Sequence, residues 1–391
     1  MLQRGQLNIK EEHSSMQSPY RVMIVDDSAV IRGFLARWLK EESDIDVVAS
    51  AGNGLIALKE FEKTRPEIVV LDIEMPVMDG MAALPKLIEM DPDVKVIMAS
   101  TLTMRNADIS MRALAKGAAD YIPKPETTRD ASKKDEFQRD LISKIKVLGE
   151  SRRKKLGQIA PASKGISEVR KPQVTAVQAG STLYKGASVN LRSHRAGLVP
   201  QILAIGSSTG GPQALFAVFE KLKGKISLPV FVTQHMPATF TAILAEHLTK
   251  ISGIQCAEAI DGEKVQNNRV YVAPGDWHMT VVKDGVDTKI KLNQNPPENY
   301  CRPAVDPMLR SLADVYGSRV LTVILTGMGQ DGMKGCEQLA KAGGYVIAQD
   351  EETSVVWGMP GAVATAGLSN AVLPLNDIPA AVENALTGRP S

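Results

Sequence analysis

Short apolar runs alternate with amphipathic stretches along the chain, in two blocks separated by a stretch without such a pattern. In the first block, the apolar runs of strand length are 21–25, 47–49, 68–71, 94–98 and 119–122. Between these runs, apolar residues recur at helical spacing, as at Val30, Phe34, Leu35 and Trp38. This alternation predicts an α/β domain over residues 20–150, with a five-stranded parallel sheet covered by helices on both faces.

The second block shows the same alternation and predicts a second α/β domain over residues 198–391. Its strand-like runs are 202–205, 230–233, 270–273, 320–325 and 345–348. Helical patterns between several of them favour a mainly parallel sheet. One antiparallel strand pair is predicted around 278–282 and 288–292, joined by a turn at 283–285.

The stretch between the blocks, residues 151–197, is rich in Ser, Gly, Ala, Lys and Arg and contains one acidic residue, Glu168, against ten basic ones. A basic tract can bind nucleic acid or anionic lipid. Tyr184 is its one aromatic residue, so base stacking has little support. A flexible basic linker is the favoured interpretation, and residues 1–19 are expected to be a disordered lead.

Composition narrows the class of protein. The 391 residues suffice for two or three domains, and 46 basic against 44 acidic residues give no global field for nucleic acid. No apolar run approaches the ~20 residues of a membrane span. The N-terminus has no secretory apolar core. Cys256, Cys301 and Cys336 have neither metal-ligand nor disulfide spacing, which favours the reducing cytoplasm. The lack of a membrane-length apolar run favours a protein that is not inserted in the membrane.

Polar residues follow the predicted strands of the first block. They are Asp26, Asp27, Asp72, Ser100 and Lys124. Carboxyl ends of parallel strands meet at one sheet edge, so these side chains should lie together. Capping explains a single Asp or Ser at such a place, but five at one edge indicate a site. Three carboxylates repel one another and need a cation, for which all-oxygen ligation suggests Mg²⁺ beside Lys124.

The first block resembles the receiver domain of bacterial response regulators, a doubly wound, flavodoxin-like fold, in VDDS at 25–28, LDIEMPVMDG at 71–80, MAST at 98–101 and YIPKP at 121–125. The resemblance implies that Asp72 accepts a phosphoryl group from a histidine kinase. It implies a Mg²⁺ site formed by Asp26, Asp27, Asp72 and the backbone carbonyl of Glu74. It further implies phosphoryl contacts from Ser100 and Lys124 and a reorienting aromatic residue, Tyr121.

The second block opens with an apolar run, a glycine-rich turn and the start of a helix at 200–212, and Gly206, Ser208 and Gly210 fit the G-x-S-x-G pattern of a serine nucleophile. A phosphate-binding or structural turn fits the pattern equally well. Two further strand ends bear His235 and Asp331. A serine needs a base and the base needs an orienting acid, so Ser208, His235 and Asp331 form a candidate triad, with an oxyanion hole in the glycine turns.

The motifs IGSSTGGP, TQHMP, YVAPGDWHM, RPAVD and ILTGMGQDGMKG resemble the catalytic domain of the chemotaxis protein-glutamate methylesterase, or CheB, family. The resemblance implies that Ser208 is the nucleophile, His235 the general base and acid, and Asp331 the orienting carboxylate. Ser207 is excluded because the family serine directly precedes Thr-Gly-Gly. Met328 is expected beside the site.

The resemblance implies a phosphorylation-activated hydrolase that demethylates glutamate methyl esters on chemoreceptor helices and deamidates receptor glutamines, with no metal in the esterase site. The resemblance also implies that it acts at membrane-bound receptor arrays. Two alternatives remain: a DNA-binding regulator, disfavoured by the long, strand-rich second block, and a scaffold with a non-hydrolytic output domain, disfavoured by the intact triad. A gel shift and a methanol-release assay would test them.

Overall fold

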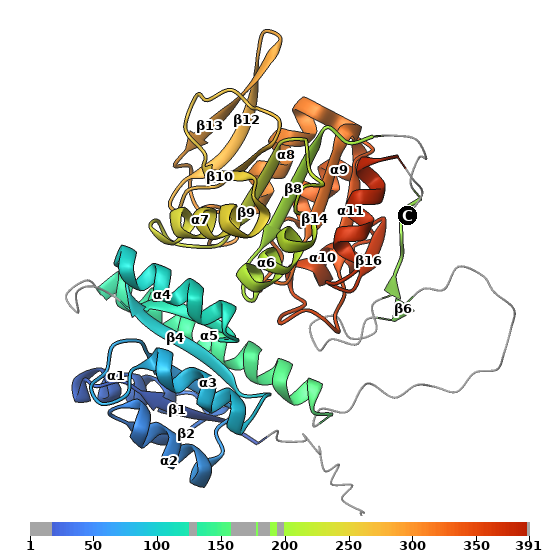
Figure 1. Ribbon diagram of the computed structural model, residues 1–391. Coiled ribbons are helices and arrows are strands. Elements are labelled where there is room, and N and C mark those ends of the chain that lie inside the picture. Colours follow the sequence, from blue (N-terminus) through green and yellow to red (C-terminus); the bar gives the residue numbers. More distant parts are fainter. Residues whose placement is uncertain (1–17, 125–130, 158–176, 179–187, 194–198, 389–391) are drawn as a thin grey trace, which may run out of the picture.

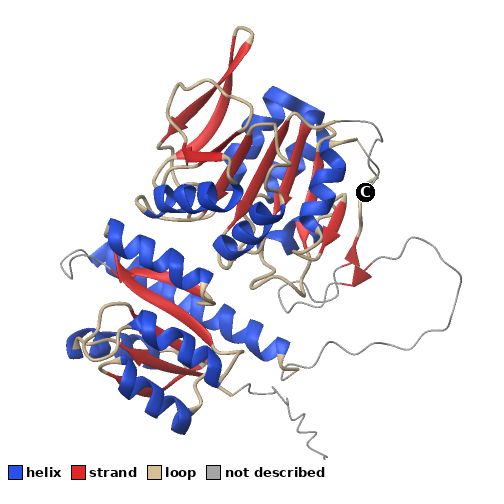
Figure 2. Ribbon diagram, in the orientation of Figure 1, coloured by secondary structure: helices blue, strands red, loops and turns tan. Residues whose placement is uncertain are grey.

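The computed structural model describes residues 18–124, 131–157, 177–178, 188–193 and 199–388. They form two α/β units, which we call the first and the second domain, and Figure 1 shows the first lying below the second. In each unit, helices flank a central sheet (Figure 2). Both parts of the fold predicted from the sequence are therefore present.

The first domain contains a five-stranded parallel sheet in the order β2-β1-β3-β4-β5, the flavodoxin-like order. The strands are β1 (Tyr20–Val25), β2 (Ile45–Ala51), β3 (Ile68–Asp72), β4 (Lys95–Thr101) and β5 (Asp120–Lys124). All are longer than the apolar runs that predicted them, because their polar ends continue the pairing.

Helices cover both faces of this sheet. They are α1 (Ala29–Lys40), α2 (Gly54–Thr64), α3 (Gly80–Met90), α4 (Met104–Ala115) and α5 (Ala131–Lys155). Side chains of α1 and α5 pack with one set of strand residues, and those of α2, α3 and α4 with the alternate set. The first four helices begin after polar N-cap residues, Ser28, Asn53, Asp79 and Thr103, whose side chains accept from backbone N–H groups in the first turn.

The second domain contains a seven-stranded parallel sheet in the order β10-β11-β9-β8-β14-β15-β16. The strands are β8 (Ile202–Ser207), β9 (Val230–Gln234), β10 (Gln255–Glu258), β11 (Arg269–Val272), β14 (Val320–Ile324), β15 (Tyr345–Gln349) and β16 (Ala371–Leu373). Its central strands are buried along their whole length, as expected for a sheet covered on both sides.

The helices of the second domain are α6 (Gly211–Lys221), α7 (Phe240–Ser252), α8 (Val305–Tyr316), α9 (Met333–Lys341), α10 (Met359–Thr365) and α11 (Ile378–Leu386). Helices α6, α7 and α11 pack on one face of the sheet, and α8, α9 and α10 on the other. The predicted strand pair is present as β12 (His278–Asp284) and β13 (Asp287–Asn293). Its turn is Gly285–Val286, later than predicted, because Asp284 still pairs with Asp287.

The boundaries of the predicted linker differ from the structure at both ends. Helix α5 runs to Lys155, beyond the predicted end of the first domain at 150, because Arg153 is buried against Glu67. Near the other end, β7 (Ser188–Val189) pairs with β6 (Val177–Gln178), and Val189 is buried against the second domain. Most of the remaining linker and residues 1–17 lie outside the described residues, so the predicted flexibility and disorder there stay predictions.

The two domains share a hydrophobic core. One continuous cluster of buried side chains includes residues of α4 and β5 and residues of α6 and α7. Figure 1 shows α4 and α5 of the first domain facing α6 and α7 of the second. Within the described parts of the chain, no helix has the combined length and apolar character that crossing a bilayer would require.

Candidate functional site

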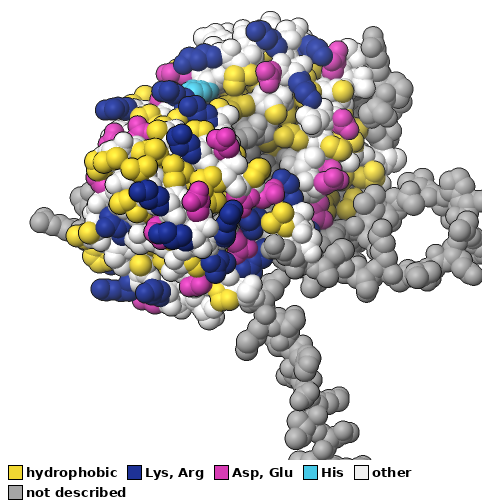
Figure 3. Space-filling view, turned by 60° about the horizontal axis from the view of Figure 1, so that its bottom comes forward, with side chains coloured by type: hydrophobic (Ala, Val, Ile, Leu, Met, Phe, Trp, Pro, Cys, Tyr) yellow, Lys and Arg dark blue, Asp and Glu magenta, His cyan; other side chains and the backbone are white. Residues whose placement is uncertain are grey.

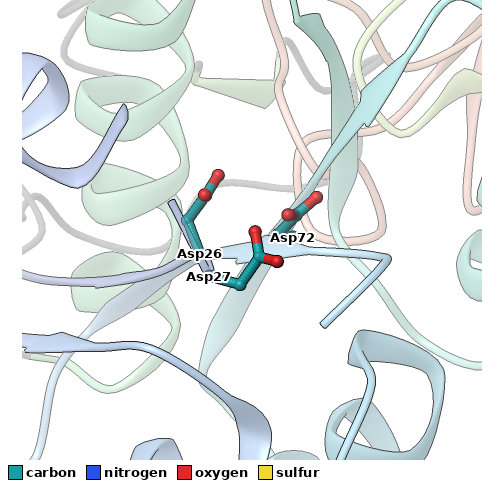
Figure 4. Close-up of side chains that lie close together, drawn as sticks. All are labelled: Asp26, Asp27 and Asp72. Carbon is teal, nitrogen blue, oxygen red and sulfur yellow. The ribbon is translucent and has the colours of Figure 1, made fainter. Parts of the chain in front are cut away.

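Three predicted carboxylates come together at the carboxyl edge of the first sheet. Asp26 and Asp27 follow β1, and Asp72 is the last residue of β3, which pairs with β1. Their carboxylate oxygens lie within 4.8 Å of one another, and Figure 4 shows the three side chains clustered at the strand ends. Asp26 and Asp72 are buried, whereas Asp27 is exposed. The sheet thus concentrates negative charge at this edge.

The ammonium group of Lys124, at the end of β5, contacts two of these carboxylates. Its Nζ lies 2.6 Å from Asp26 Oδ2 and 2.7 Å from Asp72 Oδ1. Burial, opposed by Lys124 and reinforced by the charge of Asp26, raises the pKa of Asp72 above its usual value. One lysine therefore compensates the three carboxylates only in part, which leaves a place for a further cation.

The chemistry of this cluster fits Mg²⁺. Asp26, Asp27 and Asp72 offer oxygen donors alone, and hard divalent cations prefer such donors. Among the residues that the structure describes, this is the one group of three or more His, Cys, Asp or Glu side chains with donor atoms close enough to share a metal ion. The prediction of a magnesium site is thereby consistent with the donor set.

Two further predicted residues lie near this edge but make other contacts. Ser100 of β4 is buried, and its Oγ lies 3.1 Å from Ser110 Oγ of α4. Glu74 follows β3 with an exposed side chain, 4.0 Å from Arg105. An open depression lined by Asp27, Glu74 and Arg105, among others, gives access to the cluster. The phosphoryl contact of Ser100 and the metal contact of the Glu74 carbonyl stay predictions.

Three neighbouring strands of the second sheet position the predicted catalytic residues. Ser208 follows β8, His235 follows β9, and Asp331 lies between β14 and α9. Because β8 lies between β9 and β14, the three strand ends meet at one edge. Backbone hydrogen bonds fix them there: Ser208 N donates to Thr326 O at 3.0 Å, and His235 N donates to Ser207 O at 3.2 Å.

His235 and Asp331 form a partly buried hydrogen bond, with 2.7 Å between His235 Nε2 and Asp331 Oδ2. The same carboxylate accepts from the backbone N–H groups of Val305 at 2.6 Å, Asp306 at 3.1 Å and Gly332 at 2.9 Å. Burial alone would raise the pKa of Asp331, but the hydrogen bonds from His235 and the backbone hold that pKa below its usual value. Asp331 is thus an ionised, fixed acceptor that orients the imidazole.

The second nitrogen of His235 faces a thiol. Cys301 Sγ lies 3.3 Å from His235 Nδ1. Burial disfavours the imidazolium, but Cys301 and Asp331 outweigh this and raise the pKa of His235 to about 10. Because Asp331 occupies Nε2, the nitrogen that remains to accept a proton from a nucleophile is Nδ1. The thiol therefore lies beside the atom that would act as the base.

Ser208 stands in the tight turn between β8 and α6 and is partly exposed. The neighbouring loop approaches so closely that a Cβ added at Gly327 would lie 2.9 Å from Ser208 Cβ. Gly210 has a φ of 74°, which a glycine adopts without strain. No hydrogen bond between Ser208 Oγ and His235 occurs in the described structure. The fold thus gathers the triad residues at one edge and leaves the serine unengaged by the base.

Ser207, the neighbouring serine, has a structural role. It is fully buried, and its Oγ donates to Gln234 Oε1 at 2.7 Å. The amide nitrogen of Gln234 donates in turn to Ser208 O at 2.9 Å. Ser207 therefore helps to join β8 to β9, which agrees with its exclusion as the nucleophile.

Two residues that the sequence interpretation did not assign to the site contact it directly. Asn299 Nδ2 donates to Asp331 Oδ1 at 3.0 Å and to Asp306 Oδ2 at 3.1 Å. Burial and the charge of Asp331 raise the pKa of Asp306 to about 6. Cys301, noted in the sequence only for its lack of metal-ligand spacing, contacts His235. Their one sequence signal was their place just before the RPAVD motif.

The first domain contacts the loop that bears Asp331. Ser143 Oγ of α5 lies 3.1 Å from Met328 Sδ, in the turn that follows β14. The ring of Tyr121, in β5, stacks on Phe240 of α7 with 4.5 Å between centroids. In addition, Gln213 Nε2 of α6 donates to Ala118 O at 2.6 Å. The first domain thus contacts Met328, and the expected place of this residue beside the site stays a prediction.

Comparisons with known proteins match both domains. A family model described as CheB methylesterase matches residues 203–382, and one described as response regulator receiver domain matches residues 22–134. "Protein-glutamate methylesterase/protein-glutamine glutaminase 1" of Paramagnetospirillum magneticum is 55% identical over 361 residues, covering 92% of this chain and 94% of its own. The methylesterase/glutaminase of the group 2 operon of Rhodospirillum centenum is 53% identical over 375 residues, 93% of each chain.

Among solved structures, the Thermotoga maritima CheB methylesterase catalytic domain is 42% identical, with a TM-score of 0.46, and the match covers 47% of this chain and 98% of that one.

Proposed function

The chain belongs to the CheB methylesterase family, with a response regulator receiver domain at its amino end, and from this membership we propose that Ser208, His235 and Asp331 hydrolyse glutamate methyl esters on chemoreceptors. The relatives are named as both methylesterases and glutaminases, so we extend the proposal to receptor glutamines. The partly buried His235–Asp331 hydrogen bond, at the sheet edge that also bears Ser208, is the observation that carries it. The matches give no support to a non-hydrolytic output domain.

In the first half of the reaction, Ser208 Oγ attacks the side-chain carbonyl carbon of the methylated glutamate. His235 Nδ1 takes the serine proton, because Nε2 is held by Asp331. The tetrahedral intermediate collapses, and the proton on Nδ1 goes to the leaving methoxide, which departs as methanol. A glutamine side chain follows the same course and releases ammonia. Asp331 holds the imidazole orientation and stabilises its positive charge.

The negative oxygen of the tetrahedral intermediate needs donors that are already in place. Ser208 precedes α6, and the first N–H groups of a helix carry partial positive charge. We assign the oxyanion hole to the backbone N–H groups of Thr209 and Gly210, because the N–H of Gly211 already donates to Ser208 O at 2.7 Å. In the second half of the reaction, water gives its proton to His235 and attacks the glutamyl ester, which restores Ser208 and leaves a carboxylate.

The receiver domain controls this chemistry through Asp72. Asp26, Asp27 and Asp72, with the backbone carbonyl of Glu74, would hold Mg²⁺, which supplies charge neutralisation at the phosphoryl oxygens when bound. The carboxylate of Asp72 accepts the phosphoryl group from the histidine kinase of the chemotaxis system. Lys124 already contacts Asp72 and is placed to bind a phosphoryl oxygen. Ser100 binds another oxygen after its contact with Ser110 breaks.

Phosphorylation changes the contact between the two domains. Tyr121 and Ser143 of the receiver contact Phe240 and Met328 of the catalytic domain. We propose that the unphosphorylated receiver, held by these contacts, hinders access of a receptor helix to Ser208. Movement of Ser100 and Tyr121 toward a phosphoryl group on Asp72 breaks the Tyr121–Phe240 stack and releases the receiver. To change the ratio of released to docked receiver from 1:99 to 99:1, phosphorylation must favour the released state by about 5.5 kcal/mol.

One face of the molecule carries side chains of both charge signs. Figure 3 shows Lys and Arg side chains interspersed with Asp and Glu over the face it presents, with no patch of a single sign. From the family membership, we propose that the protein acts in the cytoplasm, on receptor arrays and without inserting in the membrane.

The test is methanol release from methylated receptor membranes, measured with and without a small acyl phosphate as phosphodonor. We expect release by the parent chain, faster with the phosphodonor, and none by Ser208→Ala. Absence of methanol release in the presence of phosphodonor would refute the proposed activity.

A further inference from the structure

A tight turn at Asn299–Tyr300 connects the residues that support the triad. Glu298 and Cys301 exchange backbone hydrogen bonds of 3.1 and 2.9 Å across it. Both central residues are left-handed, with φ of 52° at Asn299 and 64° at Tyr300. Positive φ at both positions is the type I′ pattern, which strongly favours Asn and Gly. Asn299 suits the turn, whereas a tyrosine in the second central position is strained.

The two neighbours of Tyr300 account for the position of the turn. Asn299 donates to Asp331, and Cys301 contacts His235 Nδ1. Tyr300 makes no comparable contribution, since its side chain is 97% exposed. A glycine or asparagine would form the same turn with less strain and without an exposed ring. Tyr300 therefore lowers the stability of the folded chain through backbone strain, and its exposed ring adds no stabilising packing.

A second exposed aromatic residue lies in the adjoining loop. Trp277 is 39% exposed and follows Asp276, which has a φ of 68°. Asp276 N donates to Arg302 O at 3.1 Å, and Arg302 Nη2 lies 2.6 Å from Asp276 Oδ1. The loop with Trp277 and the loop with Tyr300 are thus tied to each other, next to residues that contact the triad.

We propose that Tyr300, with Trp277 of the adjoining loop, contacts the receptor helix that bears the methyl ester while that ester is bound at Ser208. The contact rests on the proposed hydrolysis of receptor esters. A glutamate methyl ester on a helix is flanked by side chains three and four residues away, so the rim of the site must meet them. Aromatic rings suit this role, because they offer a large, rigid surface that packs on aliphatic stems and tolerates polar neighbours.

This role predicts a separation between large and small substrates. A receptor helix reaches the rim and the triad together, whereas a small ester such as N-acetylglutamate γ-methyl ester reaches the triad alone. Loss of the Tyr300 ring should therefore weaken receptor binding and leave the chemistry at Ser208 unchanged. Since the strain also disappears, the folded chain should not become less stable.

The experiment uses the full chain with an acyl phosphate and measures methanol release over a range of methylated receptor concentrations. Tyr300→Asn is expected to raise the receptor KM about tenfold, which corresponds to about 1.4 kcal/mol. Its kcat, its turnover of the small ester and its Tm should match or exceed those of the parent. Tyr300→Phe keeps the ring and should keep the parent KM.

Two control substitutions separate the exposure of Tyr300 from its left-handed backbone. Val286→Ser removes a residue that is 96% exposed at the β12–β13 turn, and Arg65→Gly relieves a left-handed residue in the receiver. Neither should change the receptor KM.

An unchanged receptor KM in Tyr300→Asn overturns the proposed contact. So does an equal loss on both substrates, since this would place Tyr300 among the residues that position His235 and Asp331. A parent chain that hydrolyses the small ester but releases no methanol from receptors overturns the proposed function, and the contact with it.

Discussion

The two parallel sheets of this protein each carry a site at their carboxyl edge, but the two edges differ in how completely their charges are balanced. In the receiver, Lys124 contacts only two of the three clustered carboxylates, those of Asp26 and Asp72, and not that of Asp27. In the catalytic domain, Asp331 is buried and accepts hydrogen bonds from two side chains and three backbone N–H groups.

This difference suits the receiver edge to regulation and the catalytic edge to catalysis with a fixed geometry. The receiver edge is under-compensated and open to a groove, so a cation or a phosphoryl group changes its charge balance substantially. At the catalytic edge, Asp331 already has its hydrogen-bond partners, so it holds the imidazole of His235 in one orientation. Substitutions at the catalytic edge should lower turnover directly, whereas those at the receiver edge should change its regulation.

The largest effect is expected at the nucleophile. Ser208→Ala should lower turnover by about 10⁴-fold or more, as in a hydrolase without its nucleophile. Ser207→Ala should keep most of the turnover, and its main cost should be stability, because the buried Oε1 of Gln234 loses its donor. Methanol release and thermal unfolding of both variants check this, and the reverse ranking of their activities would assign the nucleophile to Ser207.

Within the triad, Asp331 should matter less than His235. Asp331→Asn removes the charge that stabilises the imidazolium but leaves a base in place, whereas His235→Ala removes the base. We expect Asp331→Asn to retain about ten to a hundred times more activity than His235→Ala. Single-turnover rates on methylated receptor give the comparison. Parent-like activity of Asp331→Asn would remove Asp331 from the mechanism.

At the receiver edge, regulation should be lost without loss of chemistry. Asp72→Ala should keep the basal rate and show no stimulation by an acyl phosphate. A fragment of residues 188–391, which keeps the buried Val189, should exceed the basal rate on the order of tenfold, because α5 and β5 no longer cover the site. Methanol release with and without phosphodonor measures both. A fragment no faster than the unphosphorylated chain would contradict occlusion.

The smallest predicted effect is a change in pH dependence at the catalytic edge. His235 must be neutral to accept a proton, and its raised pKa, about 10, means that kcat/KM should increase with pH through the alkaline range. Cys301 is one of the groups that raise this pKa, so Cys301→Ala should shift the rising limb to lower pH. The pH profile on a small methyl ester checks the direction. An unshifted limb would show that the thiol does not influence the base.

Strand ends account for most of what the sequence could predict. Ser208, His235, Asp26 and Asp72 each follow or end a buried apolar run, and parallel strands bring such positions to one edge by geometry alone. The alternation of runs and amphipathic stretches likewise gave both sheets, because the helices of each domain must bury one apolar face.

The residues that escaped prediction lie where no periodic pattern operates. Asn299 and Cys301 belong to a turn between a strand pair and α8, and their contacts with Asp331 and His235 depend on how that turn packs. The end of α5 escaped for a different reason. A run of basic residues resembles a linker, but Arg153 finds a buried partner in Glu67, 86 positions earlier in the chain.

The stack of Tyr121 on Phe240 links two equilibria, the phosphorylation of Asp72 and the separation of the two domains. If phosphorylation of Asp72 weakens that contact, then anything that separates the domains must favour the phosphorylated form by the same free energy. A receptor helix that occupies the site would displace the receiver and so act as an effector of the phosphorylation equilibrium at Asp72. The substrate would thereby favour the phosphorylated state that admits it, and the equilibrium level of Asp72 phosphorylation with and without receptor membranes measures this coupling.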